Sequence, residues 1–206
     1  MIITYYGLSC FKIQSKPSEG VSVIVDPFND STGLSVPKTD TNLIILNSNI
    51  KYITGKNITG STFTIDSAGE YDVKNIAVKG INIKGSKQVI YRIAIDNISV
   101  VHLGELNRIL STEELEEING TDILIVPIGG KTMLDAAKAR EVIGQIEPRI
   151  VIPMLYNLPD LKIELDGLEK FIKEMGIEPT NEEKLRINKR DDLPSEDMEL
   201  VILGTK

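Results

Sequence analysis

The sequence predicts an α/β (α+β) fold with two mixed β-sheets and helices outside. One observation behind this prediction is that short β-branched and aromatic runs, separated by turn residues, fill the first hundred positions. A second is that helical patterns occur only after residue 110, where they alternate with short apolar runs. Many strands followed by strand–helix–strand units favour two packed sheets with helices on their outer faces. Because the 206 residues contain neither a repeat nor a linker, we expect a single domain over residues 1–206.

Strands are expected first, punctuated by glycine, proline and polar turn residues. Their expected ranges are 2–6, 10–14, 21–25, 43–46, 62–65, 75–81, 89–95 and 98–102. The polar segment 16–20 is expected to close a hairpin, and Asp96 and Asn97 suit a two-residue turn because both residue types tolerate positive φ. The wholly apolar run 43–46 is typical of a strand that is covered on both faces.

Three helices are expected in the second half. Ser111 and Glu114 form a capping box that opens a short helix through residue 118. Residues 132–135 resemble a second cap, and apolar residues at a 3.6 period carry that helix to about residue 146. Asp166, with Glu169 three residues later, is expected to cap a third helix that ends at Gly176. Strands are expected at 122–127, 149–153, 185–188 and 199–203.

The amino-acid composition indicates which binding partners and which cellular compartment to expect. The net charge of −7 and the pI of about 4.9 disfavour a nucleic-acid partner, because an acidic surface repels phosphates. No apolar run approaches the roughly 18 residues that span a membrane, so we expect no membrane partner. The N-terminal residues lack a signal-peptide pattern, and we expect a cytoplasmic protein. The one cysteine, Cys10, excludes a disulfide framework and a thiolate zinc site, and we expect it to be an inert core thiol.

Histidine is the most informative residue type, because the chain contains one copy, His102. Histidine is the commonest metal ligand and the usual acid or base near neutral pH. Any mechanism that needs two histidines is therefore excluded within one chain.

Several short segments, spread in order along nearly the whole chain, together resemble the sequence motifs of a known protein family. They are ITYYGLSCF at 3–11, VDPF at 25–28, GEY at 69–71, HLGEL at 102–106, VPIGG at 126–130 and EPRIVIPM at 147–154. Together they resemble the metallo-β-lactamase superfamily, in particular small metal-dependent hydrolases similar to ascorbate-6-phosphate lactonase. The resemblance implies a four-layer αββα sandwich with its site in a cleft at the strand ends. It also implies a zinc-dependent hydrolase.

The sequence departs from that family at its metal ligands. The family motif His-x-His-x-Asp-His should follow the strand at 43–46, where this chain has NSNIKYI at 47–53. None of the residues at the lost ligand positions is a good zinc ligand. These positions are Ser48, Ile50, Tyr52, Ile53 and, for the family's last histidine, Leu155. The family's His-x-Gly-Asp segment keeps its histidine as His102, but Glu105 replaces the aspartate.

Counting ligands leads to the main hypothesis. A catalytic zinc keeps three protein ligands and a water. His102 and Glu105 supply two at most, and Asp26, which lies beside the ligands in the family, could add one carboxylate. Such an oxygen-rich set suits weak Mg²⁺ or Mn²⁺ better than zinc. We therefore expect no cofactor and a catalytically inactive or impaired homologue, whose role would be binding or assembly.

The alternative is a metal-dependent hydrolase of the lactone or phosphoester class that uses an atypical metal set of Asp26, His102 and Glu105. A third hypothesis is a partner-dependent protein whose cleft is completed by another subunit, and a homo-oligomer is one form that this could take. The small-molecule ligand is not identified by the sequence under any of the three.

Each candidate residue also has a structural interpretation. His102 is then an inherited residue that is hydrogen-bonded in the cleft, Asp26 ends a strand and satisfies loop amides, and Glu105 lies at a backbone amide. Ile50, Ile53 and Leu155 are then expected to form an apolar plug where the metal ligands would be.

Overall fold

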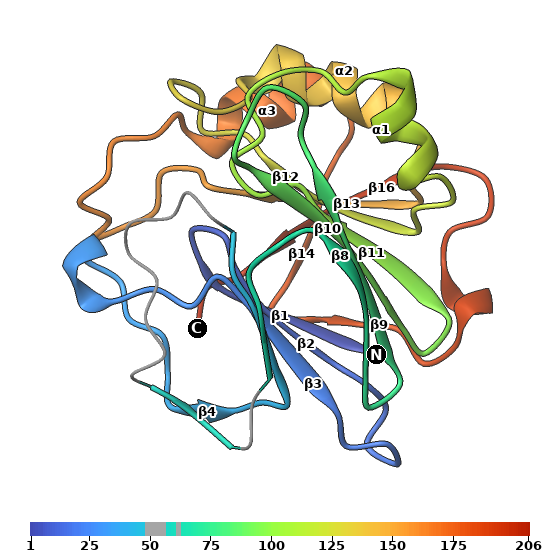
Figure 1. The fold of residues 1–206 in the computed structure, drawn as a ribbon. Helices are drawn as coiled ribbons and strands as arrows, with labels where there is room; N and C mark the ends of the chain where they lie inside the picture. Colours follow the sequence, from blue (N-terminus) through green and yellow to red (C-terminus); the bar gives the residue numbers. More distant parts are fainter. Residues whose placement is uncertain (48–56, 61–62) are drawn as a thin grey trace.

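Two mixed β-sheets pack face to face in the computed structural model, which describes residues 1–47, 57–60 and 63–206 (Figure 1). The fold class expected from the sequence is thereby confirmed. Both sheets contribute to one hydrophobic core, in which the Tyr5 and Phe11 rings stack with centroids 4.6 Å apart. Cys10 is fully buried beside them, and burial raises the pKa of its thiol well above the usual value.

The first sheet has six strands in the order β15-β1-β2-β3-β5-β7. Their bounds are β1 (Ile2–Gly7), β2 (Cys10–Gln14), β3 (Ser22–Val25), β5 (Leu43–Ile45), β7 (Phe63–Ile65) and β15 (Leu185–Arg186). The strands β1, β2 and β3 pair antiparallel, whereas β5 runs parallel to β3 and β7. Val25 lies opposite Ile45, so β3 and β5 end at the same edge of this sheet.

A short ribbon lies against the outer face of the first sheet. It consists of β4 (Thr39–Asp40) and β6 (Ile58–Thr59). The Lys12 ammonium of β2 donates to the Thr39 hydroxyl at 2.7 Å and to the Asp40 carbonyl at 2.8 Å. The Lys12 side chain of β2 is therefore held against this ribbon and buried.

The second sheet has eight strands in the order β14-β16-β13-β12-β11-β10-β9-β8. Their bounds are β8 (Gly69–Val73), β9 (Ile76–Asn82), β10 (Val89–Ile95), β11 (Ile98–His102), β12 (Ile123–Pro127), β13 (Ile150–Met154), β14 (Thr180–Glu182) and β16 (Glu199–Leu203). The strands β8 to β11 pair antiparallel, and the strands from β11 to β14 across the sheet pair parallel. Asp96 and Asn97 have φ of 55° and 62°, as expected for the turn between β10 and β11.

The helices α1 (Thr112–Glu117), α2 (Ala136–Ile146) and α3 (Leu168–Met175) lie together on the outer side of the eight-stranded sheet (Figure 1). Two short 3₁₀ turns, η1 (Asp30–Thr32) and η2 (Arg190–Asp192), complete the helical elements of the described residues. Across these residues, 1–47, 57–60 and 63–206, no α-helix lies on the outer side of the six-stranded sheet. The helical layer that is described is thus one-sided.

The first residues of the three helices can be compared with the N-caps predicted from the sequence. Ser111 and Glu114 form the capping box of α1, and Asp135 caps α2 by accepting from the Lys138 N–H at 2.9 Å. The expected cap of α3 is wrong, because the helix begins after Gly167 and has no side-chain cap. Asp166 lies one residue too early and instead pairs with Lys170 at 2.8 Å.

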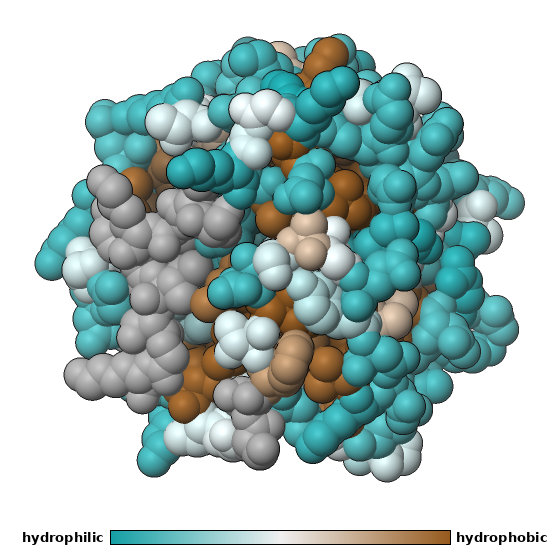
Figure 2. Space-filling view, viewed as in Figure 1, coloured by the Kyte–Doolittle hydropathy of each residue, from teal (hydrophilic) through white to brown (hydrophobic). Residues whose placement is uncertain are grey.

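The surface is largely polar on the face shown in Figure 2, with apolar residues visible in patches near its centre. Among the described residues, the large apolar side chains that are exposed are Phe63 and Ile109. No helix in this part of the chain is long and apolar enough to cross a membrane.

Candidate functional site

The candidate site lies where strands from both sheets end. Asp26 directly follows β3, His102 is the last residue of β11, and Leu155 directly follows β13. Hydrogen bonds join the two sheets here: His102 Nε2 lies 3.0 Å from the Ser9 carbonyl, and the Leu155 N–H donates to the Leu8 carbonyl at 3.0 Å. The turn between β1 and β2 is thus attached to the ends of β11 and β13.

His102 is fully buried, and both of its ring nitrogens have backbone partners. The Gly104 N–H donates to Nδ1 at 3.2 Å, so Nδ1 carries no proton and Nε2–H donates to the Ser9 carbonyl. Burial lowers the pKa of His102 to about 4, against which the Ser9 hydrogen bond acts. The Phe11 ring meets the imidazole edge-on, with centroids 6.0 Å apart. His102 is therefore a neutral ring at neutral pH, held from both sides by the main chain.

Asp26 is fully buried and has a positive φ of 47°. Its Oδ1 accepts from the Asn47 N–H at 2.7 Å, which agrees with the structural interpretation of Asp26 as an acceptor for a loop amide. Its Oδ2 has no hydrogen-bond partner. Burial raises the pKa of Asp26 to about 7, the Asn47 N–H and the Ser9 side chain lower it, and the charge of Glu105 raises it further.

Asn47, which directly follows β5, was missed by the sequence analysis. Its side chain is 1% exposed, and its Nδ2 donates to the Val89 carbonyl at 2.9 Å. It packs against Gly104, where a Cβ atom would lie 1.9 Å from Nδ2. Asn47 therefore joins the end of the first sheet to the turn after His102. A polar residue placed directly after a buried strand is the signal that could have identified it.

The turn after β11 carries Glu105. The Glu105 backbone carbonyl accepts from Gln88 Nε2 at 2.7 Å, and its side chain is half-buried. Burial raises the pKa of the Glu105 carboxyl. The structure thus brings Asp26, His102 and Glu105 into one region, although His102 uses both of its nitrogens there.

Leu155 is the residue that the resemblance places at the family's last histidine. It is 5% exposed, as the apolar-plug hypothesis predicts for it. Its φ of 55° turns the chain so that its carbonyl passes close to Gly129, where a Cβ atom would lie 2.1 Å from the Leu155 oxygen. The other lost ligand positions, Ser48, Ile50, Tyr52 and Ile53, lie outside the described residues.

The residues present do not fit a zinc ion. A histidine ligand needs a neutral ring nitrogen with a free lone pair, and His102 Nδ1 already accepts from Gly104 while Nε2 carries the proton. In residues 1–47, 57–60 and 63–206, no group of three or more histidine, cysteine, aspartate or glutamate side chains could hold a metal ion. The chain has no second histidine anywhere in its sequence.

Known proteins share both the sequence pattern and the fold. A family model described as the β-lactamase superfamily domain matches residues 2–155. The UPF0173 protein of Pyrococcus abyssi is 28% identical, over 76% of this chain and 84% of its own length. The UPF0173 metal-dependent hydrolase of Methanocaldococcus jannaschii is 21% identical, over 86% of this chain and 94% of its own length.

A solved structure gives the likeness in three dimensions. It is the crystal structure of a candidate zinc-dependent hydrolase of the metallo-β-lactamase superfamily from Thermotoga maritima. The match has a TM-score of 0.85 and 24% identity, and covers 100% of this chain and 99% of that one. At that identity the likeness shows the fold alone. Since the family model spans most of the chain and the fold agrees with it, this chain belongs to the metallo-β-lactamase superfamily and is a homologue of the UPF0173 metal-dependent hydrolases.

Proposed function

We propose that this chain is a metallo-β-lactamase-fold protein without the family's zinc centre, catalytically impaired, with a binding or assembly role. The observation that carries the proposal is the state of His102, whose two ring nitrogens both have backbone partners. A metal could use this ring only if one of those hydrogen bonds were broken.

Breaking either bond would be unfavourable. The Ser9 residue is buried, so its carbonyl would be left without its donor if Nε2 turned to a metal. Leaving a buried polar group unpaired costs about 1–3 kcal/mol. The gain from a metal bound by one histidine and scattered carboxylates is small, because zinc sites are built from three or four ligands.

A second function is a metal-dependent hydrolase of the lactone or phosphoester class, with Asp26, His102 and Glu105 around Mg²⁺ or Mn²⁺. The observation that favours it is the buried Asp26 Oδ2, which has no partner. The name of the Methanocaldococcus jannaschii relative is consistent with it. The finer resemblance to ascorbate-6-phosphate lactonase would make a lactone the first substrate to test.

Measurements of metal content and of substrate turnover distinguish the protein without a zinc centre from the metal-dependent hydrolase. We expect untagged protein, purified without added metal, to contain far less than one zinc per chain by elemental analysis, and to show no change in melting temperature with a chelator. One tightly bound zinc per chain, whose removal lowers the melting temperature, would overturn the first proposal.

Activity is measured on a panel of lactones and phosphodiesters with Mn²⁺ present. Turnover that vanishes in both Asp26→Asn and His102→Asn would establish the second function. The exposed substitution Asp160→Asn is the matched control, because Asp160 also has a positive φ. A cytoplasmic location and a small-molecule ligand belong to both proposals.

A further inference from the structure

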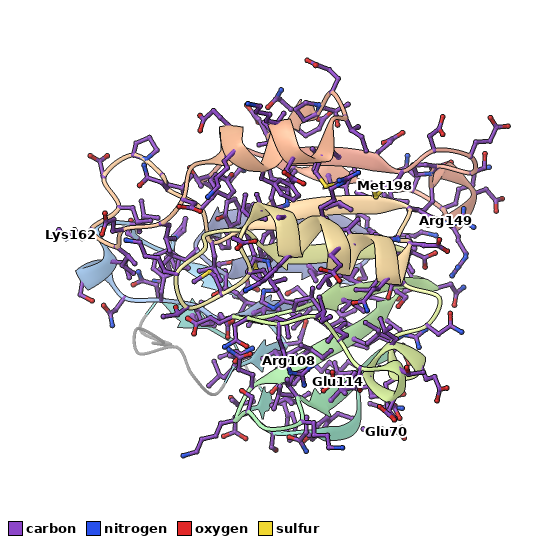
Figure 3. The ribbon with its side chains drawn as sticks, turned by 90° about the horizontal axis from the view of Figure 1, so that it is seen from above. Glu70, Arg108, Glu114, Arg149, Lys162 and Met198 are labelled. Carbon is purple, nitrogen blue, oxygen red and sulfur yellow. The ribbon has the colours of Figure 1, made fainter. Side chains whose placement is uncertain are left out.

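The eight-stranded sheet ends in a strand, β8, whose outer side has no partner among the described residues. β8 is the last strand in the sheet order and pairs with β9 on its inner side. Its backbone forms no hydrogen bond with any other element in residues 1–47, 57–60 and 63–206. Figure 3 shows Glu70 of this strand at the margin of the molecule. An unpaired strand edge offers its N–H and C=O groups to a further strand.

The turn between β8 and β9 determines which backbone groups of β8 point outward. Its two central residues, 74–75, have φ of 52° and 65°, which is typical of a two-residue turn that closes on a hydrogen-bonded pair, here Val73 and Ile76. Hydrogen-bonded and non-hydrogen-bonded pairs alternate along an antiparallel ladder. Glu70 and Asp72 are therefore in non-hydrogen-bonded pairs with β9, and their N–H and C=O groups point away from it.

The side chains on this edge are negative at the same two residues. Glu70 and Asp72 are both exposed. Across β9, Glu70 lies opposite Lys79, which pairs with it at 3.5 Å and also with Glu117 of α1. Asp72 lies opposite Ala77 and forms no ion pair within the described part of the chain. A cation on a further strand would supply the charge that β9 does not offer to Asp72.

There is room beside Asp72 for the side chains of a further strand. A hollow of about 430 Å³ lies along this edge, and the small side chains of Ala77 and Ala94 are part of its lining. Arg92 also lines it, but its Nε donates to the Ser99 hydroxyl at 3.0 Å, on the side of β11. The Arg92 guanidinium is therefore held by the sheet and leaves the Asp72 carboxylate without a cation.

A second copy of this chain does not fit this edge. Outward groups pair with outward groups, so β8 of a second copy would place one of its own two carboxylates opposite Glu70 or Asp72. Like charges directly opposite each other destabilise a pair of strands. Charged side chains of this kind prevent an edge from pairing with copies of itself. The edge therefore favours an extended segment of the opposite charge.

We propose that the β8 edge binds an extended segment of a partner protein as a further antiparallel strand, with lysine or arginine opposite Glu70 and Asp72. The residue between these two cations lies on the other face of the sheet, next to the half-buried Tyr71, and is therefore apolar. The backbone groups supply affinity, and the alternating side chains supply specificity. This inference goes beyond the proposed function, because it concerns a surface that contains none of the lost ligand positions and does not depend on the zinc content.

The test is a titration of the ¹⁵N-labelled full chain with a capped pentapeptide of alternating lysine and valine, followed by NMR. We expect saturable shifts of the Glu70 and Asp72 amide signals and slower hydrogen exchange at both amides, with a Kd on the order of 10⁻⁴ M, as for a small transient interface. A peptide of alternating glutamate and valine should not bind. N-methylation of the lysines removes the N–H groups that face β8 and should abolish binding, whereas N-methylation of the valines should leave it unchanged.

Variants of the exposed side chains test the charge. Asp72→Asn should weaken binding about threefold, and Glu70→Gln should weaken it less, because Lys79 already pairs with Glu70. Asp72→Lys should abolish binding of the lysine peptide. Asp197→Asn, at an exposed residue of the loop before β16, is the control and should leave the affinity unchanged.

The inference is overturned if the lysine peptide gives no saturable shift at millimolar concentration, if the shifts lie outside β8 and β9, or if the peptide with N-methylated lysines binds equally well. A dimer of the chain that pairs through β8 would overturn the choice of partner. If Asp72→Lys fails to fold, the comparison of Asp72→Asn with Asp197→Asn decides whether the charge contributes.

Discussion

Arg108 and Glu114 form a two-point ion pair, with Nη1 2.9 Å from Oε2 and Nη2 2.7 Å from Oε1 (Figure 3). The same carboxylate accepts the N–H groups of Ser111 and Lys84, each at 2.9 Å. Glu114 therefore holds together the first turn of α1, the loop before it and the turn between β9 and β10. This arrangement fixes one end of the segment that carries Glu105.

The Glu114 carboxylate makes the free energy of unfolding depend on pH in the acid range. The Arg108 guanidinium holds the pKa of Glu114 at about 2, below its ordinary 4.5. Because the pKa is lower in the folded state, the stabilisation is complete above about pH 4.5 and is lost as the pH falls towards 2. We expect Glu114→Gln to lower the free energy of unfolding at pH 7 by about 1–3 kcal/mol.

Urea unfolding between pH 2 and pH 7 measures this difference, which should shrink as the pH falls. Glu116→Gln, in the same helix but exposed, is the control and should change stability by less than about 0.5 kcal/mol. Equal effects of the two substitutions at pH 7 would contradict the role of the ion pair.

Gly104 allows the Asn47 amide to pack against the turn after His102. Its φ is +57°, and a Cβ atom there would lie 1.9 Å from Asn47 Nδ2. Gly120 has a φ of +73° with nothing within 4 Å of its Cβ position, so it isolates the effect of backbone strain. We expect Gly120→Ala to cost about 1 kcal/mol and Gly104→Ala to cost about 1–3 kcal/mol more. If Gly104→Ala and Gly120→Ala lowered the free energy of unfolding equally in chemical denaturation, the Asn47 side chain would be able to move away from position 104 at no cost.

Most strands and two of the three helix caps could be predicted, because they depend on local patterns. The sequence did not predict the strands β4, β6, β8 and β14. The Ser111 and Asp135 caps need only a polar residue at the correct spacing, and the structure has both. The Asp166 cap failed because α3 begins one residue later than the pattern predicts, with Gly167 at the N-cap position, and the Asp166 carboxylate pairs with Lys170 instead.

The partners of the site residues could not be predicted in the same way. The bond from His102 to Ser9 joins residues 93 positions apart, and no local pattern encodes it. Asn47 was overlooked because its function depends on Val89 and Gly104, which only the fold brings to it.

His102 should be visible as a neutral ring with its proton on Nε2. Burial lowers its pKa to about 4, so we expect ¹⁵N NMR to show the Nε2–H tautomer at pH 7 and no imidazolium at pH 6. A ring that titrates near its ordinary pKa of 6.5, or an Nδ1–H tautomer, would contradict the hydrogen bonds to Ser9 and Gly104.

Replacing the ring tests its structural role. His102→Asn should lower the free energy of unfolding by about 1–3 kcal/mol, because the buried Ser9 carbonyl loses its donor. Size-exclusion chromatography should show an unchanged oligomeric state. Hydrogen exchange should quicken in the turn between β1 and β2, and unchanged exchange there would show that His102 does not hold that turn.

Leu155 provides the sharpest test of whether the family's metal site can be restored. Leu155→His would supply the histidine that the resemblance implies at this position. The Leu155 side chain is 5% exposed and belongs to the hydrophobic core. A polar ring placed there loses apolar burial and is poorly hydrated, so we expect the free energy of unfolding to fall by about 2–4 kcal/mol. Leu158→His, at a half-buried position of the following loop, is the control and should lower the free energy of unfolding by less.

Zinc titration of both variants should give no stoichiometric binding. Each variant adds a single histidine, and the two ring nitrogens of His102 already have hydrogen-bond partners in the main chain. Tight binding of one zinc by Leu155→His alone would mean that the His102 ring can give up its backbone hydrogen bonds. That result would favour the metal-dependent hydrolase over the proposal of a chain without a zinc centre.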